Sequence, residues 1–234
     1  MATPSTLKLL SAGAVKRGVT EIAAAYERAS GNKVDVEFTQ VHKMLKRIAA
    51  GEAVDVLVAT VGGMDELAAS GKIVPATRAL LGRSRVGVLV HKDALLPDVS
   101  DTESFKRALL AAEAVVHNDA SSGVYVAELL EKLGLKTQLG DRIIVVGSGA
   151  AINTTVAERG VSAIGMGQIS EIKVMIDKGC AVKLVAPLPD AIQNISTYHA
   201  AATSTSAVSD AAAVLARELT SAAAKFVFAA TGID

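Results

Sequence analysis

Aromatic residues are scarce in this chain of 234 residues: Trp is absent, and Phe, Tyr and Trp together make up 3% of the sequence. Surfaces that stack nucleobases or sugar rings are rich in aromatic side chains, so the composition argues against both kinds of binding. Lys plus Arg and Asp plus Glu both number 24, which leaves no net charge. Because no global field attracts polyanions, neither nucleic acid nor an acidic membrane surface is a predicted partner.

Cysteine is scarce, and long apolar runs are missing as well. Cys180 is the single cysteine, so no internal disulfide can form and no second thiol is present for a zinc or redox motif. No apolar run approaches the length that spans a bilayer, and residues 1–15 lack the pattern of a signal peptide. We therefore expect a soluble monomer without direct membrane insertion. It is either periplasmic, after removal of a signal peptide, or cytoplasmic.

Sequence motifs for cofactors and for serine hydrolases are also lacking. His91, His117 and His199 are scattered through strand-like segments and form no pattern of metal ligands. The glycine-rich run 147–149 lacks the lysine and the spacing of a P-loop, and neither a dinucleotide fingerprint nor a Gly-x-Ser-x-Gly elbow is found. The sequence predicts no metal and no cofactor.

A repeated strand, turn and helix pattern is what the chain does contain. Leu7 to Ser30 reads as a short apolar strand, a turn of small residues at 11–14 and an amphipathic helix, and similar units follow. Alternating strands and helices predict an α/β protein with parallel sheets. The predicted strands are 7–10, 34–38, 54–60, 85–91, 114–117, 143–146, 161–166, 182–185 and 198–202; the predicted helices are 15–26, 41–48, 64–70, 103–112, 124–133, 150–158, 168–177, 210–219 and 221–230.

These units are too numerous for one nucleotide-binding half, so we infer two lobes. Residues 1–84 with 197–234 form the first predicted lobe, and residues 85–196 form the second. Each lobe is expected to hold a mainly parallel sheet flanked by helices, with a ligand cleft between the lobes. Ligands of such sheets bind beyond the carboxyl ends of the strands. The turns at Ser11, Thr39, Thr60, Ser121, Gly149 and Gly167 are predicted to lie there.

Small residues before several predicted helices favour the binding of an anion. The first N–H groups of a helix have no partner inside it and lie at its positive end. Lys16 and Arg17 add positive charge after the first turn, although both also fit a solvated surface. Ser121 and Ser122 fit either the N-cap of a helix or an anion-binding position. Tyr125 could either point its phenol into a cleft or fill space in the core.

The order of several segments resembles a known family across nearly the whole chain. SAGAVKRGVTEIAAAYERASGNKVDVEF, AAGEAVDVLVAT, MDELAASGKI, RALLGRSRVGVLVHKD and ASSGVYVAELLEKLG follow one another as they do in the periplasmic molybdate-binding proteins of ABC transporters. IGMGQISEI and LVAPLPDAIQNISTYHAA look closer to a branch of the same type II solute-binding family that contains aconitate isomerases. The resemblance implies a two-lobed periplasmic binding protein fold of type II.

The resemblance also implies where a ligand is held, because molybdate binders hold their oxyanion with hydroxyls and main-chain amides from corresponding turns. A transporter subunit in the membrane is the implied partner. Carried onto this chain, the positions in the first lobe are Ser11, Ala12, Gly13, Gln40, Val41 and His42, and those in the second are Ser121, Ser122, Gly123, Ala151 and Ile152. Lys16 and Tyr125 join this set as candidates from their places in the sequence.

The second turn departs from the molybdate binders, whose serines are replaced here by Gln40, Val41 and His42. Cationic donors beside small turns fit an organic carboxylate better than molybdate. The main expectation is a solute-binding protein that clamps a small anion, either an oxyanion or a carboxylate. The alternative is an aconitate-isomerase-like enzyme, with Tyr125, His42 and Lys16 as its candidate catalytic residues, because a proton shift needs a base, a proton donor and cations. A cytoplasmic sensor is a third possibility.

Overall fold

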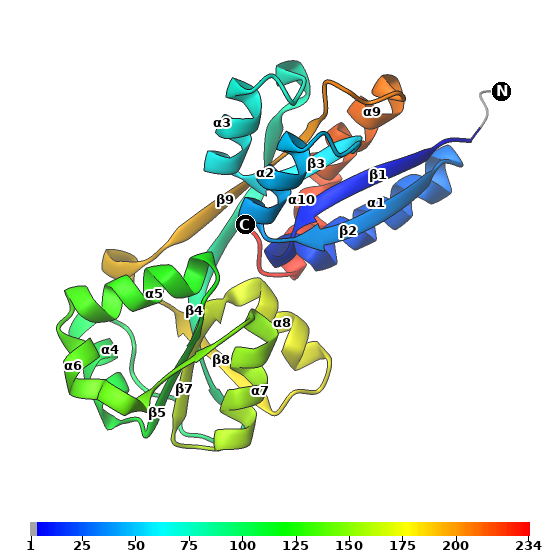
Figure 1. The fold of residues 1–234 in the computed structure, drawn as a ribbon. Helices are drawn as coiled ribbons and strands as arrows, with labels where there is room; N and C mark the ends of the chain where they lie inside the picture. The colour runs from blue at the N-terminus through cyan, green and yellow to red at the C-terminus, as the bar shows by residue number, and fades with distance from the viewer. Residues whose placement is uncertain (1–3) are drawn as a thin grey trace. The chain divides into compact units, whose positions relative to one another are not determined.

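The computed structural model describes residues 4–234. The chain divides into two compact units, of which unit 1 comprises the residues up to Ser84 together with Ser196–Asp234, and unit 2 comprises Arg85–Ile195. Unit 1 is thus built from both ends of the sequence, and unit 2 from a continuous middle segment (Figure 1).

Unit 1 has a sheet in the order β2, β1, β3, β9. Strands β1 (Thr6–Ala12), β2 (Lys33–Thr39) and β3 (Val56–Thr60) are parallel, and β9 (Ile195–Ala202) pairs antiparallel with β3. The helices of this unit are α1 (Lys16–Ser30), α2 (Val41–Ala49), α3 (Val61–Ala69), α9 (Ser209–Leu219) and α10 (Ala222–Ala230).

Both faces of this sheet are covered, which explains why its central strands are apolar at nearly every position. In β1, Leu7 and Leu9 enter a core with residues of α1, α9 and α10, whereas Leu10 enters a second core with α2 and α3. All three leucines are fully buried. The helices therefore fix the sheet from both sides and leave its strand ends to form the turns.

Unit 2 repeats this design with a sheet in the order β4, β7, β5, β6, in which β8 also pairs with β4. Strands β5 (Ala114–Asn118), β6 (Ile143–Val146) and β7 (Ala163–Gln168) are parallel. Strands β4 (Ala79–His91) and β8 (Val182–Pro187) pair antiparallel with each other, and β4 also pairs antiparallel with β7. The helices of unit 2 are α4 (Thr102–Ala111), α5 (Ser121–Lys132), α6 (Leu135–Leu139), α7 (Gly149–Arg159) and α8 (Ile169–Asp177).

The structure confirms the predicted α/β class and corrects several details. Each sheet is mixed, because β9 in unit 1 and β4 and β8 in unit 2 run antiparallel to their neighbours. Strand β4 begins at Ala79, six residues before the predicted start at Arg85, and Arg83 within this extension exchanges two backbone hydrogen bonds with Asp234. The short helix α6 and four 3₁₀ helices, η1 (Gly13–Val15), η2 (Pro75–Thr77), η3 (Gly140–Arg142) and η4 (Asp190–Ile192), were not predicted.

Four charged side chains join β1, β2 and the end of α2. Arg47 Nε donates to Glu52 at 2.5 Å and Arg47 Nη2 to Glu37 at 2.7 Å, while Lys8 Nζ donates to Glu52 at 2.8 Å. The hydrogen bonds from Arg47, and then those from Lys8, lower the pKa of Glu52 from 4.5 to about 2. The network therefore requires Glu52 to be ionised.

We expect the free energy of unfolding to fall as the pH drops from about 4.5 toward 2, because the depressed pKa of Glu52 stabilises the fold only while the carboxylate is charged. Glu52→Gln should remove part of this dependence, and urea unfolding at pH values across this window measures it. Glu66→Gln is the matched control, because Glu66 is an exposed residue of α3. An acid dependence in Glu52→Gln identical to that of the wild type would contradict the assignment.

Candidate functional site

In unit 1, the turns after β1 and β2 leave the same edge of the sheet. The two strands are parallel, and their register runs to the pair Ala12 and Thr39. Gly13 begins η1 directly after β1, and Val41 begins α2 directly after Gln40. The structure therefore brings together the predicted first-lobe residues, which are Ser11, Ala12, Gly13, Lys16, Gln40, Val41 and His42.

Ser11 lies inside β1 and not in the turn where the sequence placed it. Pairing with β2 extends the strand through Ala12, so Ser11 is fully buried and its Oγ donates to the Ala12 carbonyl at 3.1 Å. Gly13 is exposed, and a Cβ on it would meet no atom within 4 Å. The accessible part of this turn is therefore the backbone of Gly13, and the Ser11 hydroxyl lies behind it.

Lys16 and His42 place two basic side chains at this edge of unit 1. Lys16 is the first residue of α1, and its Nζ lies 5.2 Å from the centre of the Phe38 ring on β2, a cation–π distance. His42 is an exposed residue in the first turn of α2. Gln40, which precedes α2, makes no hydrogen bond from its side chain to the helix start. The first N–H groups of α2 are thus uncapped beside two basic side chains.

In unit 2, helix α5 starts without a side-chain cap. Its N-cap is Ala120, and its first two residues are Ser121 and Ser122. The suggestion that one of these serines caps the helix is therefore wrong, because both already lie within the first turn. By contrast, Asp101, Ser148 and Ser221 each accept a hydrogen bond from the backbone at the starts of α4, α7 and α10.

Gly123 allows the chain to pack closely at the start of α5. A Cβ on Gly123 would lie 1.7 Å from the backbone oxygen of Asn118 and 2.3 Å from its Oδ1. Asn118 is the last residue of β5, and Ser122 is 4% exposed. The absence of a side chain at position 123 therefore sets how closely the end of β5 approaches the first turn of α5.

The N–H groups of Ala151 and Ile152, at the start of α7, are already paired. Ala151 N donates to Ser148 Oγ at 3.1 Å, and Ile152 N donates to the Ser148 carbonyl at 3.2 Å. The side chain of Ile152 is fully buried. A ligand would therefore have to displace Ser148 in order to reach the Ala151 amide.

The side chain of Tyr125 contacts the core of unit 2. Its hydroxyl donates to the Ile192 carbonyl at 2.9 Å, and its ring packs against the main core of unit 2. Burial raises the pKa of its phenol. These contacts favour the core alternative over a phenol that points into a cleft.

Two polar groups, His199 on β9 and Glu171 on α8, were not proposed as site residues from the sequence. On β9 of unit 1, His199 Nδ1 accepts a hydrogen bond from Arg78 Nε at 2.9 Å, and Arg78 also pairs with Asp65 at 2.8 Å. Burial, and then the Arg78 charge, lower the pKa of His199. In unit 2, Glu171 lies in the first turn of α8. The sequence signal for Glu171 was an acidic residue at a predicted helix start, whereas nothing local predicts the pairing of His199 with Arg78.

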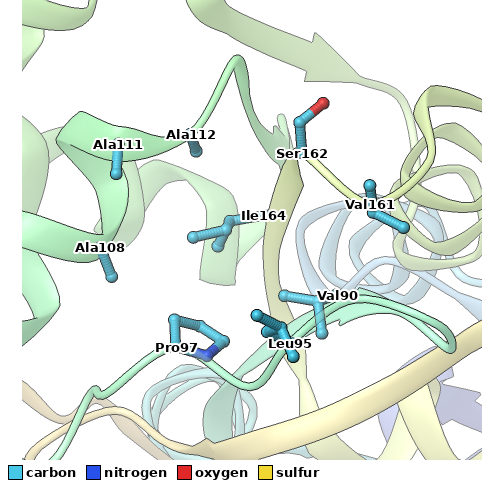
Figure 2. A pocket seen from close by; sticks show the side chains of 9 residues that line it. All are labelled: Val90, Leu95, Pro97, Ala108, Ala111, Ala112, Val161, Ser162 and Ile164. Atoms are coloured by element: carbon cyan, nitrogen blue, oxygen red, sulfur yellow. The ribbon is translucent and has the colours of Figure 1, made fainter.

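A separate hollow in unit 2 lies where β5 and β7 begin, away from the helix starts described above (Figure 2). Its lining carries no charged side chain, and the hydroxyl of Ser162 donates to Glu113 at 2.8 Å. This composition does not suit an anion. The lining residues are Val90, Leu95, Pro97, Ala108, Ala111, Ala112, Val161, Ser162 and Ile164.

Within residues 4–234, no group of three or more His, Cys, Asp or Glu side chains is placed to hold a metal ion. The helices of the same range are all too short or too polar to cross a membrane. The groups described above at the strand ends are backbone N–H groups, hydroxyls and a few charged side chains.

Comparison with known proteins identifies the family of the chain. Residues 7–234 match the family described as bacterial extracellular solute-binding protein. The chain belongs to this family. This solute-binding protein is also 30% identical over 223 residues to an aconitate isomerase from a Pseudomonas species, a match that covers 93% of the chain and 83% of the relative.

Two solved structures share the fold of this solute-binding protein. One is the substrate-binding domain of a putative molybdenum ABC transporter from Clostridium difficile, with a TM-score of 0.77, 19% identity and 98% of each chain covered. The other is the periplasmic molybdate-binding protein of Azotobacter vinelandii, with a TM-score of 0.77, 17% identity and coverage of 97% of this chain and 98% of that one. The predicted type II binding-protein fold and its family are confirmed.

Proposed function

We propose that this solute-binding protein binds a small anion, either an oxyanion or an organic carboxylate, at helix starts that follow its strands. The candidate donors in unit 1 are the turn at Ser11, Ala12 and Gly13 together with the start of α2. The candidate donors in unit 2 are those at the start of α5. We propose no metal and no cofactor, because hydroxyls and backbone N–H groups suffice to hold an anion.

The observation that carries this proposal is the uncapped first turn of α5. In unit 2, α4 and α7 are capped by the side chains of Asp101 and Ser148, whereas the N-cap of α5 is Ala120, and two serines lie inside the first turn of α5. Helix α8 also lacks a side-chain cap. Unpaired N–H groups at the positive end of a helix favour an anion. Each hydrogen bond to a charged ligand contributes about 1.5–3 kcal/mol, so a few donors are enough for tight binding.

The ligand class follows from the side chains beside these helix starts. Two of the structural relatives are named for molybdenum or molybdate, and their likeness supports an oxyanion. Lys16 and His42 support a carboxylate instead, because cationic donors form charge-assisted hydrogen bonds with carboxylates. Of the two, we favour the carboxylate. Ala151 and Ile152 would join the site only after release from Ser148.

A thermal-shift and calorimetry panel of molybdate, tungstate, sulfate, and di- and tricarboxylates tests the proposal. A ligand at 100 times its dissociation constant should raise the free energy of unfolding by about 2.7 kcal/mol. Ser122→Ala should lower the affinity for that ligand by about ten- to a hundredfold. Thr137→Ala, at an exposed position of α6, is the matched control and should leave the affinity unchanged. No stabilisation by any member of the panel would refute anion binding.

A second candidate function is aconitate isomerisation, favoured by the 30% identity to an aconitate isomerase over 93% of the chain. In this reaction a base removes a proton from one carbon and a donor returns a proton at another, without net change in composition. Lys16 would offset a carboxylate, and His42 and Tyr125 would exchange protons once Tyr125 leaves the Ile192 carbonyl. Conversion of trans- to cis-aconitate, followed over time, tests this candidate. Conversion no faster than in the double variant His42→Ala, Tyr125→Phe would exclude it.

We also propose that the protein acts outside the cytoplasm as a monomer and delivers its ligand to a transporter subunit in the membrane. The extracellular family that matches residues 7–234 supports this placement. The start of the natural reading frame, and any signal peptide before it, would test it directly.

A further inference from the structure

Glu171 lies where three helix starts of unit 2 come from neighbouring strands. It is in the first turn of α8, which follows β7. Strand β7 pairs with β5, which leads to α5, and β5 pairs on its other side with β6, which leads to α7. The edge of the sheet that we assign to anion binding therefore carries two acidic residues, the exposed Asp119 between β5 and α5 and Glu171 in the first turn of α8.

The carboxyl group of Glu171 packs directly on the first residue of α7. A Cβ on Gly149 would lie 2.0 Å from Glu171 Oε2 and 2.3 Å from its Cδ. Gly149 leaves just enough room for the carboxyl, so the contact is specific to a glycine at this position. The Glu171 side chain thus connects the starts of α8 and α7.

No cation pairs with Glu171 among residues 4–234. On α7, Glu158 and Arg159 lie in the last turn, far along the helix from Gly149. Of the basic groups on the other packed elements, Lys173 lies two residues further along α8, and Lys183 on β8 donates to the Ala94 carbonyl at 2.6 Å. Asp177 is in the last turn of α8. His117, on β5, has its Nδ1 2.9 Å from the Asn118 carbonyl oxygen. Burial raises the pKa of Glu171.

In the same cluster, the side-chain oxygen of Asn153 is a hydrogen-bond acceptor that has no donor. Its Nδ2 donates to the Gly149 carbonyl at 2.8 Å, so both Asn153 and Glu171 contact Gly149. Asn153 is 1% exposed, and its Oδ1 has no hydrogen-bond partner within the described chain. A buried acceptor without a partner costs about 1–3 kcal/mol. The O–H of a neutral Glu171 is the kind of donor that this cluster lacks.

We propose that Glu171 takes up a proton when an anion binds at the helix starts of unit 2, so that the protein recognises its ligand together with a proton. This inference rests on the proposed anion-binding function. A second negative charge near a carboxyl group opposes its ionisation. Protonation removes that repulsion and gives Glu171 a donor. Affinity for a polycarboxylate therefore rises as the pH falls toward the point where the ligand itself becomes protonated.

Calorimetry with trans-aconitate and with molybdate, in two buffers of different ionisation enthalpy near neutral pH, measures the protons taken up. For the probe that binds, the wild type should take up a measurable fraction of one proton per ligand, and Glu171→Gln should bind with none. Glu158→Gln, an exposed position on α7, is the matched control and should retain the uptake. Binding without proton uptake, or equal uptake in Glu171→Gln, overturns the inference and leaves the proposed function intact. If neither probe binds, the inference is overturned together with the proposed anion binding at the helix starts of unit 2.

A measurement without ligand tests the same carboxyl. A raised pKa stabilises the fold below the pKa of the unfolded chain, and that contribution is lost as the pH rises through the folded pKa. The stability of the wild type relative to Glu171→Gln should therefore fall as the pH rises above about 4.5, as measured by urea unfolding. Parallel pH profiles for the two proteins would contradict a raised pKa of Glu171.

Discussion

Gly123→Ala is expected to destabilise unit 2 by about 3 kcal/mol or more and to abolish anion binding at the start of α5. The added Cβ would lie 1.7 Å from the backbone oxygen of Asn118. Because the obstacle is backbone and not the tip of a flexible side chain, relief requires β5 and α5 to move apart. Such a movement displaces Ser121 and Ser122. Urea unfolding and calorimetry with the best anion of the panel measure the two effects.

Gly147→Ala is the control for this substitution. Gly147 is exposed near the end of β6, and a Cβ on it would meet no atom within 4 Å. We expect its effect on the free energy of unfolding to stay within about 0.5 kcal/mol. If Gly123→Ala were as stable as Gly147→Ala and bound the anion equally well, the close approach of Asn118 would not shape the site.

Phe228→Ala should reduce the free energy of unfolding by about 3–5 kcal/mol, because it removes a fully enclosed ring from the core of unit 1. Phe228 is 1% exposed on α10 and belongs to the core shared by β1, α1 and α9. Phe226→Ala on the same helix is the matched control, because that ring is 78% exposed. Urea unfolding of the two variants should therefore give very different midpoints.

A double-mutant cycle shows which contact Phe228 makes. A Cβ on Gly18 would lie 2.3 Å from Cδ1 and Cε1 of Phe228. Gly18→Ala should therefore be destabilising in the wild type and nearly neutral in Phe228→Ala, where the ring is gone. Equal costs of Gly18→Ala in both backgrounds would mean that the ring of Phe228 does not limit position 18.

Much of the fold could be predicted because hydrophobic periodicity reports on local structure. Met44 and Ile48, for example, are the buried residues of α2, as their spacing in the sequence predicted. Strand direction is a different matter. The apolar run in β4 reads the same whether its neighbours are parallel or antiparallel, and only pairing with β7 and β8 distant in the sequence decides it.

The candidate site was predictable to the level of turns and not of single atoms. Ser11 and Ser122 stand in runs of small residues, and such runs do not reveal where a strand stops or which residue caps a helix. Ser11 lies within the sheet because β1 pairs with β2 as far as Ala12, and Ala120 occupies the N-cap position that a serine could have filled. Glu171 escaped notice because its surroundings depend on Gly149, on a different helix.

The division of unit 1 between the two ends of the chain has a consequence for biosynthesis. Strand β3 acquires its antiparallel neighbour only from residues 198–202, so a growing chain exposes that edge until more than two thirds of its length has been made. Unit 2 is continuous, so all of its residues precede 196–234 in the chain. Truncation before β9 would therefore leave the edge of β3 unpaired and open to aggregation.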